Sequence, residues 1–150
     1  ICDWKFVKVK NGKNTLFTSL FDENEVIPIP INHAEGQFII DPAIESEIES
    51  HAQLIYCDSN GKVIEDHPVN PNQSFKNIAG LSNKRGNVLA MMPHPERAYQ
   101  IKQIPTWIQS EWTDKKRENF KNGGSSEGPW NRFFKAIGQY LDSQQGLKNA

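Results

Sequence analysis

The sequence predicts a mixed α/β fold in a single domain. Residues 88–92 are a continuous apolar run, typical of a strand buried on both faces, and Pro93 ends it because proline has no N–H to donate. Near the C-terminus, large apolar residues recur at helical spacing, at Trp130, Phe133, Phe134, Ile137 and Leu141. A chain of 150 residues with 37% apolar content can bury one core, so one domain is expected.

Further strands are predicted in the first third of the chain. Residues 4–10 alternate valines with lysines, which is typical of a strand with one wet face. Residues 26–31 alternate branched side chains with Pro28 and Pro30. Because neither proline can donate to a ladder, we expect an edge strand or an extended segment there. A short strand is also expected at residues 38–40.

A helix is predicted next, followed by a hairpin. Asp41 suits the N-cap and Pro42 the first helical position, and the apolar residues that follow at helical spacing extend the expected helix to Ala52. Residues 54–57 form a short strand, and the turn formers at 58–61 lead into residues 63–64 as its expected partner.

Residues 99–128 differ in character from the rest of the chain. They are rich in charge and contain Trp107, Trp112 and Phe120, so we expect an excursion on the surface with a few aromatic anchors. A basic and aromatic patch for nucleic acid is the alternative, but acidic residues are interleaved. Residues 129–145 are expected to form a closing helix that starts at Pro129 and ends before Gly146.

Composition argues against several classes of function. With 17 basic and 18 acidic residues the formal net charge is −1, so no basic field favours nucleic acid or an anionic membrane. No apolar run is long enough to span a bilayer and no signal peptide is visible. Cys2 and Cys57 form no CxxC pair, which fits a reducing cytoplasm. The histidines lack partners at metal-ligand spacing, so we expect no metal site.

His94 and Glu96 are the candidate catalytic residues. They follow the predicted buried strand, at the place where open α/β sheets present ligands and catalytic groups. A carboxylate two residues from a histidine on a stiff Pro-x-Pro turn can orient the imidazole and favour its charged form. The pair therefore has the composition of the base and orienting group of a nucleophile triad. A loop histidine with a satisfied hydrogen bond is the alternative.

A second pair with the same spacing, His33 and Glu35, precedes Gly36. This pair is either a polar turn between strands or a second wall of the same pocket. The polar loop at residues 70–74 either caps turns or contacts a ligand. Cys57 lies inside a strand pattern and is expected to be a small buried residue.

Together these segments resemble the glutaminase subunits of phosphoribosylformylglycinamidine synthase, which are class I, triad-type glutamine amidotransferases. The matching segments lie in the same order as in that family, and the C-terminal helix continues the match. They are residues 1–4, 29–36, 70–80 and 86–98.

The resemblance implies that residues 1–150 are the C-terminal part of a single glutaminase domain with a doubly wound, flavodoxin-like fold. In such a domain His94 is the general base and Glu96 its orienting carboxylate, and we expect His33 and Glu35 to contact the substrate, L-glutamine. The nucleophile is a cysteine in an elbow of the Cys-Asn-Gly-Phe-Gln kind. No such elbow occurs in this chain, and neither cysteine present matches it.

Because the elbow is absent and the chain begins at Ile1, we expect a part of a longer cytoplasmic subunit that is inactive alone. The implied partners are the N-terminal part with the cysteine, a synthetase subunit that receives ammonia and uses ATP and Mg, and a small accessory subunit. No cofactor is expected in this chain. Two alternatives stay open: a non-catalytic interaction or regulatory module on the same scaffold, and a cysteine hydrolase of another class that uses Cys57 with His94.

Overall fold

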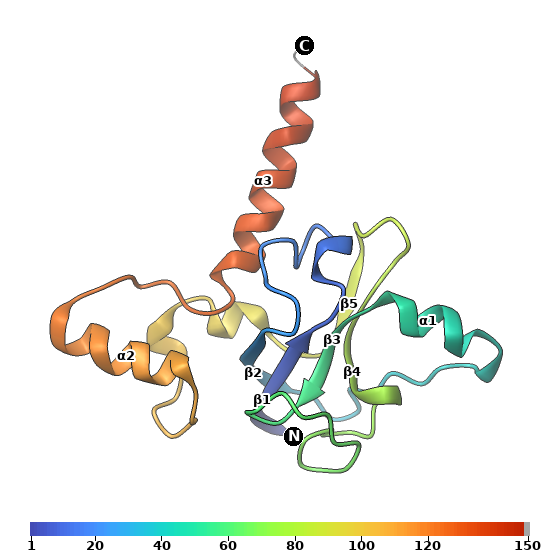
Figure 1. The fold of residues 1–150 in the computed structure, drawn as a ribbon, viewed down its shortest axis with the longest axis horizontal. Helices are drawn as coiled ribbons and strands as arrows, with labels where there is room; N and C mark the ends of the chain where they lie inside the picture. The colour runs from blue at the N-terminus through green and yellow to red at the C-terminus, as the bar shows by residue number, and fades with distance from the viewer. Residues whose placement is uncertain (149–150) are drawn as a thin grey trace.

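The computed structural model describes residues 1–148 and contains one five-stranded sheet with the order β2-β1-β3-β4-β5 (Figure 1). All four pairings between these strands are antiparallel. The strands are β1 Cys2–Val9, β2 Val26–Asn32, β3 Ala52–Cys57, β4 Ile78–Ser82 and β5 Leu89–Met91.

Strands β1 and β2 form where they are predicted, but the wet face expected for β1 is wrong, since no residue of β1 after Cys2 is exposed. Val7 and Val9 of β1 are fully buried against the core, and β2 lies at one edge of the sheet. The inner edge of β2 pairs with β1 over seven residues. Its outer edge carries Pro28 and Pro30, which have no N–H and therefore offer carbonyl oxygens alone.

The predicted helix after Asp41 is present but shorter than expected. The Asp41 side chain accepts from the Ala43 amide at 2.9 Å, a 3-10 turn η2 (Pro42–Ile44) follows, and α1 spans Glu45–His51. Ala52 belongs instead to β3, where it pairs with Leu81 and is buried. Sheet pairing therefore ends the helix one residue before the limit that its apolar spacing indicated.

Two predicted strands do not form. The turn after β3 closes with a bond from the Gly61 amide to the Asp58 carbonyl, but residues 63–64 do not pair with β3 because β1 and β4 already occupy both of its edges. Residues 38–40 also form no strand. Phe38 is held by its amide to Ser74 Oγ and by its carbonyl to the Phe75 amide, each at 3.0 Å.

Strand β5 corrects the prediction of a strand buried on both faces. It is three residues long, pairs with β4 alone and lies at the edge of the sheet. Val88 is 57% exposed and Ala90 is exposed, whereas Leu89 and Met91 pack against the core. An apolar run cannot distinguish a central strand from an edge strand, since the distinction depends on which partners the rest of the chain supplies.

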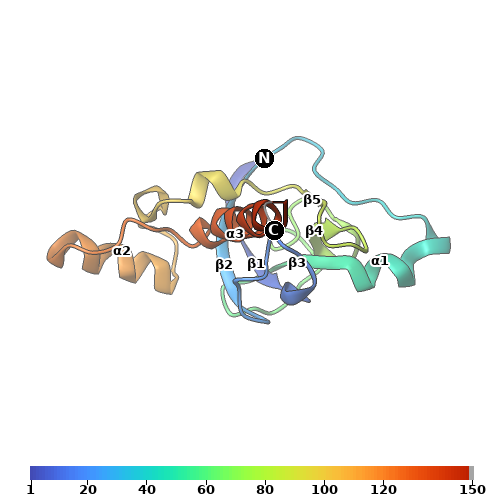
Figure 2. The ribbon, with the colours of Figure 1, turned by 90° about the horizontal axis from the view of Figure 1, so that it is seen from above.

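The aromatic repeat near the C-terminus forms α3 (Asn131–Lys148) and the turn before it. Trp130 and Phe133 are buried, and Phe134 and Ile137 pack beside them. Leu141 is 53% exposed, because α3 leaves the sheet and projects away from the body (Figures 1 and 2). The helix also continues through Gly146, contrary to the prediction, since a glycine near a helix end costs only about 1 kcal/mol.

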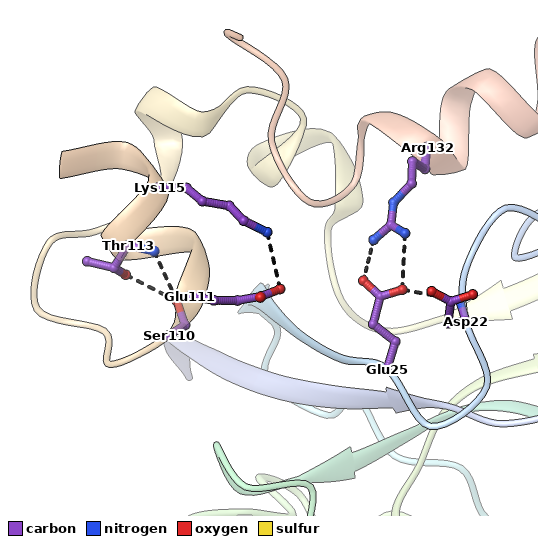
Figure 3. Close-up of polar contacts among 7 residues, drawn as sticks. All are labelled: Asp22, Glu25, Ser110, Glu111, Thr113, Lys115 and Arg132. Carbon is purple, nitrogen blue, oxygen red and sulfur yellow. Dashed lines mark hydrogen bonds and ion pairs between the residues drawn. The ribbon is translucent and has the colours of Figure 1, made fainter. Parts of the chain in front are cut away.

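The start of α3 is anchored by Arg132, which forms an ion pair with Glu25 (Figure 3). Arg132 also donates to the Leu20 carbonyl at 3.4 Å, and its guanidinium lies 4.5 Å from the centre of the Phe21 ring. These contacts join the helix to the connection between β1 and β2. No helix within residues 1–148 has the length and apolar content needed to cross a membrane.

Residues 99–128 contain a 3-10 turn η5 (Ile101–Gln103) and helix α2 (Glu111–Asn122). Helix α2 lies beyond the β2 edge of the sheet, whereas α1 lies beyond the other edge (Figures 1 and 2). The prediction of aromatic anchors is wrong for Trp107 and Phe120, which are 67% and 93% exposed. Buried aliphatic residues anchor this segment in their place: Ile101, Ile104 and Ile108. Its ends meet where the Gly128 amide donates to the Tyr99 carbonyl at 2.8 Å.

Candidate active site

His94 and Glu96 form a hydrogen-bonded pair. His94 Nδ1 lies 2.8 Å from Glu96 Oε1, because Pro95 starts a 3-10 turn, η4 (Pro95–Ala98), that directs the carboxylate back toward the ring. The Arg97 amide closes the turn on the His94 carbonyl at 3.2 Å. With Nδ1 directed at the carboxylate, Nε2 is the ring nitrogen available to a reacting group.

The outer edge of β2 holds this turn in place. The His94 amide donates to the Pro30 carbonyl at 2.9 Å, and Trp130 Nε1 donates to the Pro28 carbonyl at 2.9 Å. The Trp130 amide also reaches the Ala98 carbonyl at 3.2 Å, at the other end of the turn. The prolines predicted to mark an edge strand therefore present acceptors to which the histidine turn attaches.

Two further groups adjoin Glu96. Arg97 Nε lies 3.8 Å from Glu96 Oε1, and Gln103 Nε2 donates to the Glu96 carbonyl at 3.3 Å. Together with Tyr99 and Phe134, Gln103 lines an open hollow beside the carboxylate. The excursion at residues 99–128 thus begins in direct contact with the candidate site.

His33 lies at the end of β2, close to this turn. With its oxygen toward the ring, the Asn72 carboxamide accepts from His33 Nδ1 at 2.7 Å and from the Gly36 amide at 3.0 Å. Burial lowers the pKa of His33, and the positive charge of the Ile1 ammonium, which donates to the His33 carbonyl at 2.8 Å, lowers it further. In this orientation of Asn72 the Gly36 amide bonds to the Asn72 oxygen in preference to His33 Nδ1, which lies 3.2 Å away, and Nδ1 carries the ring proton. His33 Nε2 is buried without a hydrogen-bond partner in the described residues.

Glu35 does not join His33 in a pair resembling that of His94 and Glu96. It is exposed and lines a separate hollow with Asn72 and Gln73. The structure therefore brings His94 and Glu96 together, places His33 nearby, and directs Glu35 elsewhere.

The polar loop at residues 70–74 is mainly a buried scaffold. Asn70 donates to the Ser74 carbonyl at 2.8 Å and accepts from the Ser74 amide at 2.9 Å, and both residues are buried. Asn72, in contrast, contacts His33. The run of asparagines indicated both possibilities, but the sequence did not indicate which asparagine has which role.

Cys57 does not have the environment of a nucleophile. Cys57 is buried in β3, and burial raises the pKa of its thiol to about 12, so it is protonated at neutral pH. Cys2 is exposed at the start of β1, opposite Asn32. Within residues 1–148 no cluster of three or more metal-binding side chains occurs.

The chain as a whole matches a known class of protein. Residues 1–141 match the model of the CobB/CobQ-like glutamine amidotransferase domain, and the chain belongs to this family. This membership confirms the fold class predicted from the sequence, a class I glutamine amidotransferase fold.

Two proteins similar to this chain are the same subunit of one enzyme in two organisms. The chain is 44% identical over 100 residues to phosphoribosylformylglycinamidine synthase subunit PurQ of Chlorobium luteolum, covering 65% of this chain and 42% of the relative. It is 47% identical over 98 residues to the same subunit of Moorella thermoacetica, covering 64% and 40%. These matches confirm the resemblance recognised in the sequence. The chain spans less than half the length of either relative.

A solved structure agrees with these relatives. A chain in the structure of PurLQS from Thermotoga maritima matches with a TM-score of 0.53 and 33% identity, over 81% of this chain and 47% of that one.

Proposed function

We propose that this chain supplies the general base His94 and the orienting carboxylate Glu96 of a glutaminase, as the C-terminal part of a phosphoribosylformylglycinamidine synthase subunit in purine biosynthesis. The observation that carries the proposal is the 2.8 Å contact between His94 Nδ1 and Glu96 Oε1 in a chain related to PurQ subunits. The contact leaves Nε2 free to take a proton, as a base in a triad requires.

In the proposed reaction His94 Nε2 removes the proton from a cysteine thiol supplied by the N-terminal part of the subunit. The thiolate attacks the side-chain amide carbon of glutamine, and the imidazolium returns the proton to the leaving nitrogen, which departs as ammonia. Water then hydrolyses the resulting thioester to glutamate. Glu96 holds the ring in orientation and stabilises its charged form.

His33 is proposed to contact the substrate from the adjacent wall, because its buried Nε2 lacks a partner within residues 1–148 and can accept an N–H. The exposed Glu35 is proposed for an outer contact only. The ammonia passes to a synthetase subunit that uses ATP and Mg to aminate formylglycinamide ribonucleotide, with a small accessory subunit in the assembly. In support of a larger assembly, the similar solved chain belongs to the structure of PurLQS.

The test is His94→Ala in the whole polypeptide assembled with its synthetase. Glutamine-dependent synthesis should fall by about 10²–10⁴-fold, the usual contribution of a general base, while ammonia-dependent synthesis is retained. Glu96→Gln should lower glutamine-dependent turnover without affecting use of ammonia. Unimpaired glutamine hydrolysis by His94→Ala would contradict the assignment. Loss of both activities would indicate a damaged assembly, which far-UV circular dichroism and gel filtration would reveal.

A further inference from the structure

A groove lies between α2 and the segments on either side of it, within residues 101–126. Its volume is about 600 Å³. Lys116 of α2 forms one wall and donates to the carbonyls of Lys102 and Ile104, which fixes the helix against η5. The opposite wall is residues 124–126, where the Ser125 carbonyl accepts from Asn119 at 2.7 Å. The groove is thus held open by hydrogen bonds on both sides.

The charges that line the groove have one sign. Four lining residues are basic and none is acidic, although the chain as a whole has a net charge of −1. The carboxylates of α2, at Glu111, Asp114 and Glu118, do not line it. The basic residues are Lys102, Lys116, Arg117 and Lys121.

Two of these cations are already engaged and two are not. Lys116 is bound to backbone carbonyls, and Arg117 pairs with Asp114 at 2.9 Å. Lys102 and Lys121 are exposed, and neither has an ion pair in the described part of the chain. They are therefore free to meet a negatively charged partner.

Phe120 adds an apolar contact at the same place. It lines the groove and is 93% exposed, the largest exposure among the large apolar side chains of the described residues. Ile101, from the floor, is buried. A ring this exposed beside unpaired cations is typical of a site that receives an apolar side chain surrounded by acidic ones.

We propose that this groove is a docking site for an acidic segment of a partner protein that inserts one large apolar side chain beside Phe120. Lys102 and Lys121 form ion pairs with its carboxylates and thereby favour an acidic segment over a neutral or basic one. Nucleic acid and anionic membrane suit the groove less well, because the acidic residues of α2 adjoin it and would repel an extended phosphate array. The proposal is independent of the glutaminase function proposed above.

The test measures fluorescence anisotropy with the whole polypeptide and a labelled acidic peptide of about 12 residues that carries a central leucine and phenylalanine. The peptide should bind saturably, and binding should weaken about tenfold between about 50 and about 300 mM salt. Lys102→Glu with Lys121→Glu should weaken binding at least about tenfold, and Phe120→Ser about fivefold. Replacing both apolar residues of the peptide by serine should weaken binding as much as Phe120→Ser does.

The matched control is Lys13→Glu with Lys84→Glu, which reverses two exposed charges outside the groove and should leave binding unchanged. The double variant Lys102→Gln with Lys121→Gln removes the two charges without reversing them, as a check against damage to α2. Its loss of peptide binding should lie between that of the parent and that of the double Glu variant. Equal weakening by the control pair would overturn the proposal. So would the absence of saturable binding, tighter binding of a single-stranded oligonucleotide or of phosphatidylserine vesicles through the same lysines, or self-association that Phe120→Ser abolishes.

Discussion

The candidate base is oriented by its surroundings rather than by a strong ion pair. The side chains of His94 and Glu96 are 32% and 55% exposed, so their attraction is screened and contributes about 0–1 kcal/mol to stability. The backbone bond from His94 to Pro30 and the turn that starts at Pro95 set the position of the ring. The Glu96 contact then decides which ring nitrogen faces outward.

The environment of His33 favours its neutral form. Its pKa is lowered from 6.5, first by burial, while the Asn72 carboxamide accepts its Nδ1 proton. Below pH 6.5 the unfolded chain binds a proton here that the folded chain still excludes. The contribution of His33 to the free energy of unfolding is therefore fully present above pH 6.5. It is lost as the pH falls toward the lowered pKa of the folded state.

We predict that His33→Asn flattens this part of the pH dependence. Urea unfolding followed by circular dichroism at pH 7.5 and 5.5 measures the loss of stability on acidification, which should be smaller in the variant than in the parent. Asn60→Ser, at an exposed position without an ionisable side chain, serves as the control and should keep the parent's difference. An identical loss in the parent and in His33→Asn would contradict the prediction.

Among the elements, the outer edge of β2 joins the site to the C-terminal helix. Trp130 is fully buried, packs its ring against Phe21 and Phe133, and donates its indole N–H to the Pro28 carbonyl. The same residue reaches Ala98 through its amide. The strand edge, the histidine turn and α3 therefore share one buried side chain.

Trp130→Phe should destabilise the chain by about 2–4 kcal/mol, because it leaves a gap in the core and a buried Pro28 carbonyl without its donor. Chemical denaturation followed at 222 nm measures the change. Trp107→Phe, at a position 67% exposed, should change stability by less than about 0.5 kcal/mol. Equal effects of the two substitutions would show that the indole bond does not hold the elements together.

The two ion pairs in Figure 3 should differ in strength. Arg132 and Glu25 have side chains 30% and 17% exposed, whereas Lys115 and Glu111 are 49% and 64% exposed. A double-mutant cycle with Arg132→Met and Glu25→Gln should give a coupling of about 1–2 kcal/mol, because less water competes for the pair. The cycle with Lys115→Met and Glu111→Gln should give about 0.3–0.5 kcal/mol. A reversed order would contradict the link between burial and coupling.

For the whole molecule, the absence of a nucleophile has a direct consequence. The polypeptide of residues 1–150 should release no ammonia from glutamine above a buffer blank, because a base needs a thiol to deprotonate and the thiol of Cys57 is buried and protonated. The measurement is a coupled ammonia assay, with the whole subunit and its synthetase as the positive control. Turnover by residues 1–150 that Cys57→Ala abolishes would revive the alternative of a Cys57–His94 hydrolase.

Local sequence patterns predicted where strands and helices form better than they predicted which side chains are buried. The edge position of β2 followed from Pro28 and Pro30, and the buried start of α3 followed from the spacing of Trp130 and Phe133. The aromatic residues of the 99–128 segment were misjudged, because side-chain size alone does not tell whether neighbours cover Phe120. The end of α1 was misplaced because Ala52 suits a helix and a buried strand equally.

By itself, the sequence determined the strand with prolines and the stiff His94–Glu96 turn, because each depends on residues close together in the chain. It also determined the lack of a cysteine elbow and the resemblance to glutaminase subunits, which depend on residue identity and on the order of segments along the chain. Tertiary structure alone decided that the turn is bonded to the outer edge of β2, that Asn72 rather than Glu35 contacts His33, and that β5 is an edge strand of the sheet. These outcomes depend on pairings between distant segments, which local preferences do not specify. The structure thus changed the account of His94 from a residue at the end of a buried strand to one held by the carbonyl of Pro30.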